Sequence, residues 1–373
     1  MTLFLFELKK LLFSKKTIAI FTVLIAFVLL LFVRNLSFQS LIAKEERQAI
    51  DAQIRTSQAN GRAHILMLEK NPEDEKQKEL QSVNLQIRDP LYDLASTYSY
   101  ENWEENLKVQ NKIWGTTLDY KELGGESPFS RGEIVQKITL NEELLKQGIR
   151  PEHAAYSIAA PNFMKQVVDI WIFGGALILL LLLVGDILSS EYEGHSVNLL
   201  FTQPIKKTYI LMGKFWSACI LYVLALVITL VTAASVSFLF GDKGSFSYPT
   251  LIEQNQRVGF VSIGKYMTEG LFITTSLILL VIALILLYSL YLKQTMSTLA
   301  ALLGTFAVGY ALTALIDWNS LAWLNPFLNM LPNDLILGQN GRTWYEAIPV
   351  TLLLTVIVYG WSIRKVKNSR MVG

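Results

Sequence analysis

The sequence predicts an all-α polytopic membrane protein with six transmembrane helices and a large helical extracellular domain between the first and second of them. Hydrophobic residues make up 52% of the 373 residues, and the mean hydropathy is +0.36, which is too apolar for a soluble protein of ordinary size. Six stretches of about 20 residues are almost free of charge, and this length crosses a bilayer core. Residues 34–165, in contrast, hold 20 of the 31 acidic side chains and should face water.

The N-terminal segment, residues 1–16, is predicted to be an amphipathic helix lying along the inner leaflet. Its apolar side chains share one helical face, formed by Phe4, Leu8, Leu11 and Leu12. Glu7 and the neighbouring lysines are assigned to other faces, which is typical of an interfacial helix. A plain extension of the first span is the alternative interpretation.

The predicted spans are residues 17–33, 166–188, 215–240, 270–292, 294–316 and 347–363. With the N-terminus inside, the short cytoplasmic flanks carry twelve Lys and Arg residues and the short outer loops carry four. The positive-inside rule therefore places both termini in the cytoplasm. The connection 189–214 and the tail 364–373 are then cytoplasmic, while the loops 241–269 and 317–346 are extracellular.

The water-facing segment 34–165 is expected to be helical. Residues 40–60 and 73–89 carry apolar side chains at helical spacing among charges, so they should extend the first span outward and fold back. The outer loop 317–346 is apolar but is interrupted by Pro326 and Pro332, which predicts short broken helices rather than a further span.

Small side chains recur at every fourth position of the fifth span. They are Ser297, Ala301, Thr305, Gly309 and Thr313. Such a stripe lets another helix approach closely. It indicates either a seam for a second subunit or packing within the same chain, and the sequence leaves both interpretations open.

Several kinds of chemistry find no support in the sequence. There is no GxxxxGK[ST] loop for nucleotide phosphates and no HExxH motif, and the three histidines are far apart. The single cysteine, Cys219, lies in an apolar stretch, and the net charge of +2 gives no reason to propose a nucleic-acid partner. Ionisable residues lie only at the ends of the spans, so if the task of the chain is transport, the driving energy should come from a cytoplasmic partner.

The connection between the second and third spans has an unusual composition. Within residues 185–216, Glu191 and Glu193 should lie on the exposed end of a helix that continues past Gly185, where they can pair with a docked protein. The apolar segment 197–201 can fill a groove. Pro204 ends this element, and Lys206, Lys207 and Lys214 flank the return into the membrane. Charged anchors around a short apolar knob are typical of a mechanical contact with a partner.

This connection resembles the cytoplasmic loop of ABC-2 type permeases, the membrane subunits of ATP-binding cassette exporters. The matching residues are Glu191, Glu193, Gly194, Leu199, Leu200, Pro204, Gly213 and Lys214. His195 stands where threonine is commoner, and the Lys206–Lys207 pair stands where Ser-Arg is usual. The amphipathic N-terminus, the six spans and the inside termini also agree with the family.

The resemblance implies a complex of two permease subunits, identical or related, with two ATPase subunits in the plasma membrane of a bacterium. Residues 189–204 would be the coupling region that the ATPase grips. ATP and Mg would be bound by the ATPase, so this chain would have no catalytic residue, cofactor or metal of its own. An amphipathic substrate, such as a peptide, an antimicrobial or a lipid-like molecule, would be exported.

Two further functions stay open at this stage. Sodium export coupled to an ABC ATPase occurs in similar proteins. A membrane sensor or scaffold could instead bind a ligand through the outer domain and signal through the same loop. A membrane-embedded enzyme is disfavoured because the spans contain few acids and nucleophiles.

Overall fold

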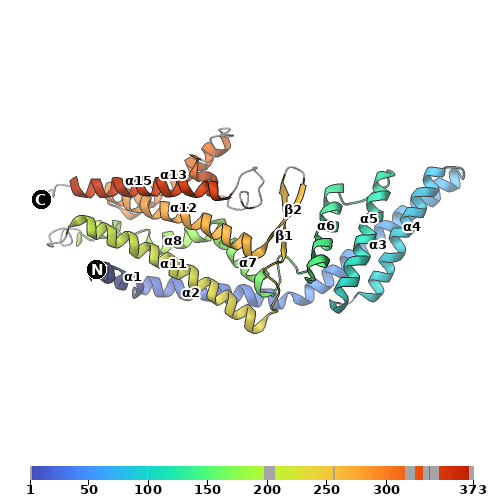
Figure 1. Ribbon diagram of the computed structural model, residues 1–373, viewed down its shortest axis with the longest axis horizontal. Helices are drawn as coiled ribbons and strands as arrows, with labels where there is room; N and C mark the ends of the chain where they lie inside the picture. Colours follow the sequence, from blue (N-terminus) through green and yellow to red (C-terminus); the bar gives the residue numbers. More distant parts are fainter. Residues whose placement is uncertain are drawn as a thin grey trace.

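A computed structural model of the chain describes residues 2–98, 100–196, 206–254, 257–315, 324–330, 336 and 344–368. The molecule is elongated, with a bundle of long apolar helices at one end and a separate helical domain at the other (Figure 1). Both described ends of the chain lie at the end of the bundle that is remote from this domain. We call this the α1 end, after the first helix, α1 (Thr2–Leu12).

Within the residues that the structure describes, six helical segments are long and apolar enough to cross a membrane. They are Lys15–Ser37 (α2), Ala160–Glu193 (α7 to α9), Lys207–Phe240 (α11), Ile263–Leu292 (α12), Thr295–Thr313 (within α13, Thr295–Leu315) and Trp344–Asn368 (η5, Trp344–Glu346, and α15, Ala347–Asn368). Five of the six predicted spans fall within these segments, and the other, residues 294–316, overlaps Thr295–Thr313 and extends past both of its ends. The expectation of a helical multi-pass membrane protein is therefore confirmed. Lys207 and Ile263 begin their helices about two turns earlier than the sequence predicted.

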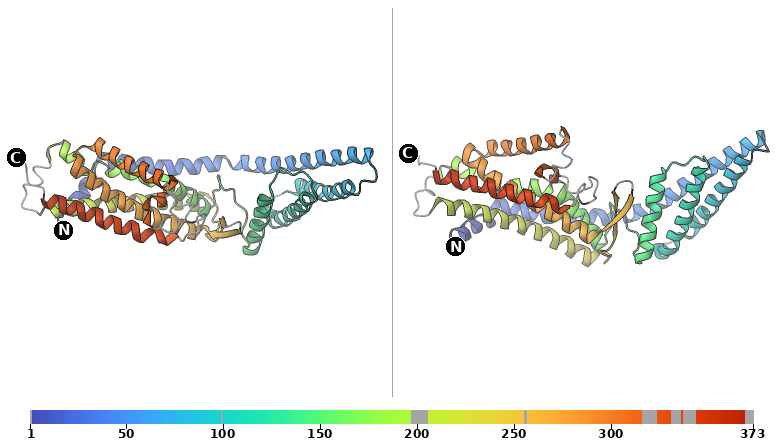
Figure 2. Two further views of the ribbon diagram at one scale, coloured as in Figure 1. Left: turned by 90° about the horizontal axis from the view of Figure 1, so that it is seen from above. Right: turned by 45° about the horizontal axis from the view of Figure 1, so that its top comes forward.

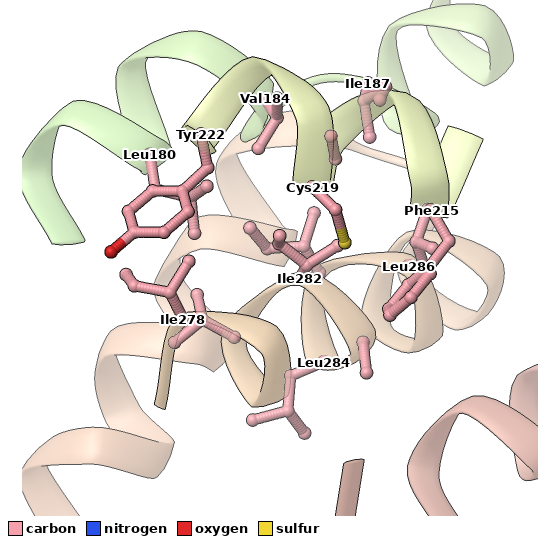
Figure 3. Packing of buried hydrophobic residues seen from close by; sticks show 14 of the residues in the cluster. Leu180, Val184, Ile187, Phe215, Cys219, Tyr222, Ile278, Ile282, Leu284 and Leu286 are labelled. Atoms are coloured by element: carbon pink, nitrogen blue, oxygen red, sulfur yellow. The ribbon is translucent and has the colours of Figure 1, made fainter. Parts of the chain in front are cut away.

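Helix α12 occupies the centre of the bundle. It packs against α15, α13, α7 and α11, and most of its side chains are buried. In the main core, Cys219 and Tyr222 of α11 face Ile278 and Ile282 of α12, with Leu180 of α8 alongside (Figure 3). Cys219 is therefore a buried member of this apolar core. The other helices leave many large apolar side chains exposed, which is the expected surface of a chain surrounded by lipid.

The second span is not one continuous helix. It consists of α7 (Ala160–Ile170), a π-helical segment η2 (Trp171–Gly175), α8 (Ala176–Val184) and, after a turn over residues 185–188, the short α9 (Ser189–Glu193). Gly174 has φ of 108°, a conformation that glycine adopts without the steric cost of a Cβ. The expectation that this helix continues past Gly185 is therefore wrong, and Glu191 lies on a separate element.

The domain remote from the α1 end contains four helices and is here called the distal domain. They are α3 (Gln39–Lys70), α4 (Glu75–Thr97), α5 (Trp103–Glu122, preceded by η1, Tyr100–Asn102) and α6 (Arg131–Gln147). Only Phe38 separates α2 from α3, so the chain passes from one long helix directly into the next (Figure 2). A capping box of Ser130 and Glu133 begins α6, and Gly148 ends it with φ of 63°. The predicted helical extension of the first span is thus observed.

Buried polar contacts join the distal domain to the bundle. The side chain of Asn35, near the end of α2, is fully buried, and its Nδ2 donates to the carbonyl of Ser157 at 2.9 Å and to Gln166 Oε1 at 2.8 Å. Gln39 donates to the carbonyl of Tyr156 at 2.7 Å. The chain leaving the bundle is therefore bonded to the chain returning to it, which fixes where α3 begins.

A β-hairpin departs from the predicted all-α fold. Strands β1 (Pro249–Gln254) and β2 (Arg257–Ser262) pair antiparallel within the segment predicted as a loop, and α12 follows directly. The short apolar and β-branched runs of this segment favour strands. The hairpin packs near the return leg of the distal domain, where the backbone N–H of Glu152 donates to the Tyr248 hydroxyl at 3.2 Å. Burial raises the pKa of the Glu152 carboxyl above its ordinary value.

The stripe of small residues on α13 packs within the chain at two of its positions. The Thr305 hydroxyl lies 2.7 Å from the Tyr288 hydroxyl of α12. Gly309 is buried, and a Cβ at that position would collide with the ring of Phe327 in η4 (Pro326–Met330). Ser297, Ala301 and Thr313 are half-buried. The described contacts therefore favour intrachain packing at Thr305 and Gly309, and η4 and η5 are the described short helical pieces of the predicted broken segment.

We predict that Gly309→Leu destabilises the protein because its side chain must displace Phe327. Overpacking of a tight contact costs roughly 1 to 3 kcal/mol. Gly304→Leu is the matched control, since Gly304 lies on the same helix with nothing within 4 Å of an added Cβ. Thermal unfolding of the purified variants in detergent should show a lower midpoint for Gly309→Leu alone. Equal midpoints would mean that Phe327 does not pack against this position.

The charge bias predicts which end of the molecule faces the cytoplasm. In a Cys219→Ala background, a cysteine at the exposed Ala59 of the distal domain should react with an impermeant thiol reagent in intact cells. A cysteine at the exposed Lys206, at the α1 end, should react only after the membrane is permeabilised. Labelling of Lys206→Cys in intact cells would reverse the proposed orientation.

Candidate functional site

A buried ammonium group organises the α1 end of the bundle. Lys214 lies two turns into α11 and is only 1% exposed. Its Nζ donates to Glu191 Oε1 at 2.7 Å, to the carbonyl of Ile187 at 3.0 Å and to Glu7 Oε2 at 3.3 Å. An ammonium has three donors, and the partners of all three come from other elements of the chain.

Glu191 is buried on α9 rather than exposed, which corrects the expectation from sequence. It is 4% exposed, and the oxygen that accepts from Lys214 also accepts from Lys10 of α1 at 3.1 Å. The Lys10 side chain is half in solvent. The carboxylate expected to pair with a docked protein is thus bonded within the chain.

Glu7 is a member of this site that the sequence analysis assigned to the wrong helical face. It lies three residues after Phe4 and four before Leu11, so helical spacing places it on the same face as these apolar side chains. The structure buries Glu7, leaves Phe4 and Leu11 half-buried, and packs α1 against α11. An acidic residue on the apolar face of an amphipathic helix indicates a buried cation on the helix that packs against it. The sequence therefore contained a signal for this site.

Glu193, the second acid of the pair, is the last residue of α9, and its carboxylate lies beside the first residue of α13. Its carboxylate accepts from the backbone N–H of Thr295 at 2.7 Å and from the Thr295 hydroxyl at 3.1 Å. The Ser189 hydroxyl lies 2.8 Å from the same threonine hydroxyl. A carboxylate at a helix N-terminus satisfies an otherwise unpaired N–H and interacts favourably with the helix dipole. The Glu193 side chain is nevertheless exposed to solvent.

A surface ion pair connects the same region to α2. Lys16 Nζ lies 2.7 Å from Asp186 Oδ1, with both side chains about 40% exposed.

We call residues 186–193 the α9 junction, because their side chains and backbone bond to α1, α2, α11 and α13. The cluster of Lys214, Lys10, Glu7 and Glu191 is balanced in charge, with two cations and two carboxylates. Such an arrangement holds helices in a fixed register.

The structure brings together only some of the residues singled out from sequence. Glu191 and Lys214 are in direct contact, and Gly194 follows α9, where an added Cβ would lie 3.2 Å from the carbonyl oxygen of Ser190. Leu199, Leu200 and Pro204 lie outside the described residues. Among the side chains that the structure describes, no group of three or more His, Cys, Asp or Glu is arranged to hold a metal ion.

Comparison with protein families gives a match over most of the chain. The family model described as ABC-2 family transporter protein matches residues 1–332, which include α1, the α9 junction and α11 to α13. No curated protein and no solved structure gives a significant match to the chain.

We predict that Lys214→Met is strongly destabilising, because it leaves Glu7 and Glu191 buried without the cation that they share. Breaking a buried ion pair by removing one partner typically costs about 3 to 5 kcal/mol. The control is Lys16→Met, which removes a half-exposed pair worth about 0 to 1 kcal/mol. Thermal unfolding and limited proteolysis after α1 should separate the two variants. If Lys214→Met unfolds at the same temperature as Lys16→Met, the buried cluster is not what holds α1.

Proposed function

The chain belongs to the ABC-2 family of transporter proteins, and on this premise we propose that it is the permease subunit of an exporter that moves an amphipathic substrate outward. Two such permease chains, identical or related, would act with two copies of a separate ATPase subunit. The α1 end would face the cytoplasm of a bacterium and the distal domain would face outward across the plasma membrane.

The observation that carries this proposal is the α9 junction. When a short element that bonds to four helices is displaced, all four helices are pulled with it. A loop that contacts only solvent would move by itself and leave the helices in place. Residues 194–206 connect the α9 junction to α11. An ATPase that pulls or pushes on that connection would therefore act on α1, α2, α11 and α13 together.

The roles of the individual residues follow from their burial. Glu191 and Lys214 are positioning residues, because their charged groups are bonded inside the protein. Glu193 is exposed and couples α9 to α13. Leu199, Leu200 and Pro204 are the residues that we propose contact the ATPase, with the two leucines in an apolar groove. Residues 189–204 together remain the proposed coupling region.

The distribution of buried charge supports an ATP-driven mechanism and an amphipathic substrate. In the described spans, the buried ionisable side chains lie at helix ends: Lys214 and Glu191 at the α1 end, and Glu269 in the second turn of α12 at the opposite end. Ion-coupled carriers usually hold carboxylates near the membrane midplane. Apolar and hydroxyl side chains line the middle of α11 and α12, which suits a substrate with few charges.

A ligand sensor is the second candidate function. It is favoured by a cavity of about 290 Å³ in the distal domain. In a sensor, a ligand bound there would change the signal at the α9 junction without net movement of substrate across the membrane. Transport by reconstituted vesicles separates the two functions.

We predict that Leu199→Ala combined with Leu200→Ala lowers the amount of ATPase that co-purifies with the permease. Burying one leucine side chain contributes roughly 1.5 to 3 kcal/mol, so losing two should weaken binding by more than about tenfold. Glu193→Gln should keep the ATPase bound but reduce the stimulation of its hydrolysis, because the charged contact with α13 is weakened. The measurements are pull-down of the ATPase and ATP hydrolysis in nanodiscs.

Lys206→Ala is the control within the same connection, since its charge is proposed to set topology and not to bind the ATPase. The amount of permease in the membrane should be equal for all variants. If the double leucine variant retains the ATPase like the parent protein, residues 197–201 are not the contact.

A further inference from the structure

The distal domain contains a partly open cavity that has no role in the α9 junction. Its volume is about 290 Å³, and its walls come from all four helices, α3 to α6, and from the segment that follows α6. An engineered apolar cavity of about 150 Å³ holds a benzene molecule, and ligand pockets begin at about 300 Å³. The cavity is therefore large enough for one substituted aromatic ring or a molecule of similar size.

Aromatic and aliphatic side chains form most of its inner wall. Tyr98, Trp103 and Trp114 line it together with leucine and isoleucine side chains of α4 and α5. Trp114 is 6% exposed and packs edge-on against Phe129, with ring centroids 4.9 Å apart. A rigid wall of this kind suits the apolar body of a ligand, because aromatic rings supply a large contact area with little side-chain entropy to lose.

The charged groups at the cavity favour an anion. Lys137 and Arg150 contribute two positive charges and Glu46 contributes one negative charge. Glu46 Oε2 already accepts from the Tyr98 hydroxyl at 2.6 Å. Lys137 Nζ lies over the rings of Trp114 and Phe129, at 5.3 and 5.7 Å from their centroids, so the ammonium stands at the aromatic wall.

Amide side chains add polar contacts beside these charges. Asn106 and Asn141 line the cavity and are almost fully buried, and Asn141 Nδ2 donates to Asn111 Oδ1 at 2.9 Å. A few fixed polar groups among apolar walls are the usual composition of a small-molecule site.

We propose that this cavity binds a small amphipathic anion, with an aromatic or branched apolar body against Trp103 and Trp114 and a carboxylate or similar head group near Lys137 and Arg150. The proposal does not depend on the proposed function, because either a transporter or a sensor could carry the site. Its test measures ligand binding, and transport or ATPase activity is not part of the readout.

The experiment uses the purified full-length chain in nanodiscs and three fluorinated probes that differ in charge only at the head group. They are 4-(trifluoromethyl)benzoate, 4-(trifluoromethyl)benzamide and 4-(trifluoromethyl)benzylamine, titrated and followed by fluorine NMR. The benzoate should bind saturably and at least about tenfold more tightly than the benzylamine, because charge-assisted hydrogen bonds to the two cations favour it. Equal binding of benzoate and benzylamine would overturn the assignment to an anion.

Two pairs of variants locate the binding. Ala49→Phe places a ring in the cavity wall and should abolish benzoate binding, while Ala52→Phe, also exposed on α3 but not lining the cavity, should leave it unchanged. Lys137→Gln should weaken benzoate binding roughly tenfold and leave benzamide binding unaltered. Lys146→Gln, which removes a charge from α6 away from the cavity, should change neither. No saturable binding, or equal binding in Ala49→Phe and parent protein, would refute the site.

Discussion

The ion cluster around Lys214 is the interaction on which the α1 end of this protein depends. A charge removed from water is tolerated only with partners that replace its hydration, and the partners of Lys214 come from α1, from α9 and from the turn before α9. The need to satisfy one buried ammonium therefore fixes the N-terminal helix against α11. It also explains why α11 can begin at Lys207 and carry a lysine into the packed bundle.

The bilayer sets a second constraint, which the interrupted second span has to meet. A π-helical segment with a residue at positive φ frees backbone groups that lipid cannot satisfy, so such a segment must lie against protein. Trp171 at the start of η2 is buried and donates to the Tyr222 hydroxyl of α11 at 3.3 Å, and that hydroxyl lies 3.2 Å from the Thr275 hydroxyl of α12. Trp171 and Ile172, at the start of the break, thus pack against α11 and α12, whereas Phe173 is exposed.

The near-continuous run of α2 and α3 relates the two ends of the molecule. Lys16, in the first turn of α2, pairs with Asp186 of the α9 junction, while Asn35 fixes the far end of the same helix to the return leg of the distal domain. Helix α3 then forms one wall of the distal cavity. The candidate coupling region thus contacts the start of α2, and α3, which follows α2, lines the candidate ligand site. The two sites are therefore joined by consecutive helices, and α2 is held to the bundle near both of its ends.

The sequence by itself determined the six apolar helices, the helical distal domain and the position of the charged segment that ends the second span. Hydropathy and local charge are sufficient for these features because lipid and water act on each segment separately. Only the tertiary structure decided that Glu191 is buried, that Glu7 belongs to the same site, and that Gly309 packs against Phe327. Glu7 and Lys214 are 207 residues apart in the chain, and no local pattern relates them. Their pairing arises only when α1 and α11 pack together. In the resulting low-dielectric interface an unpaired charge is costly, so the two side chains pair with each other.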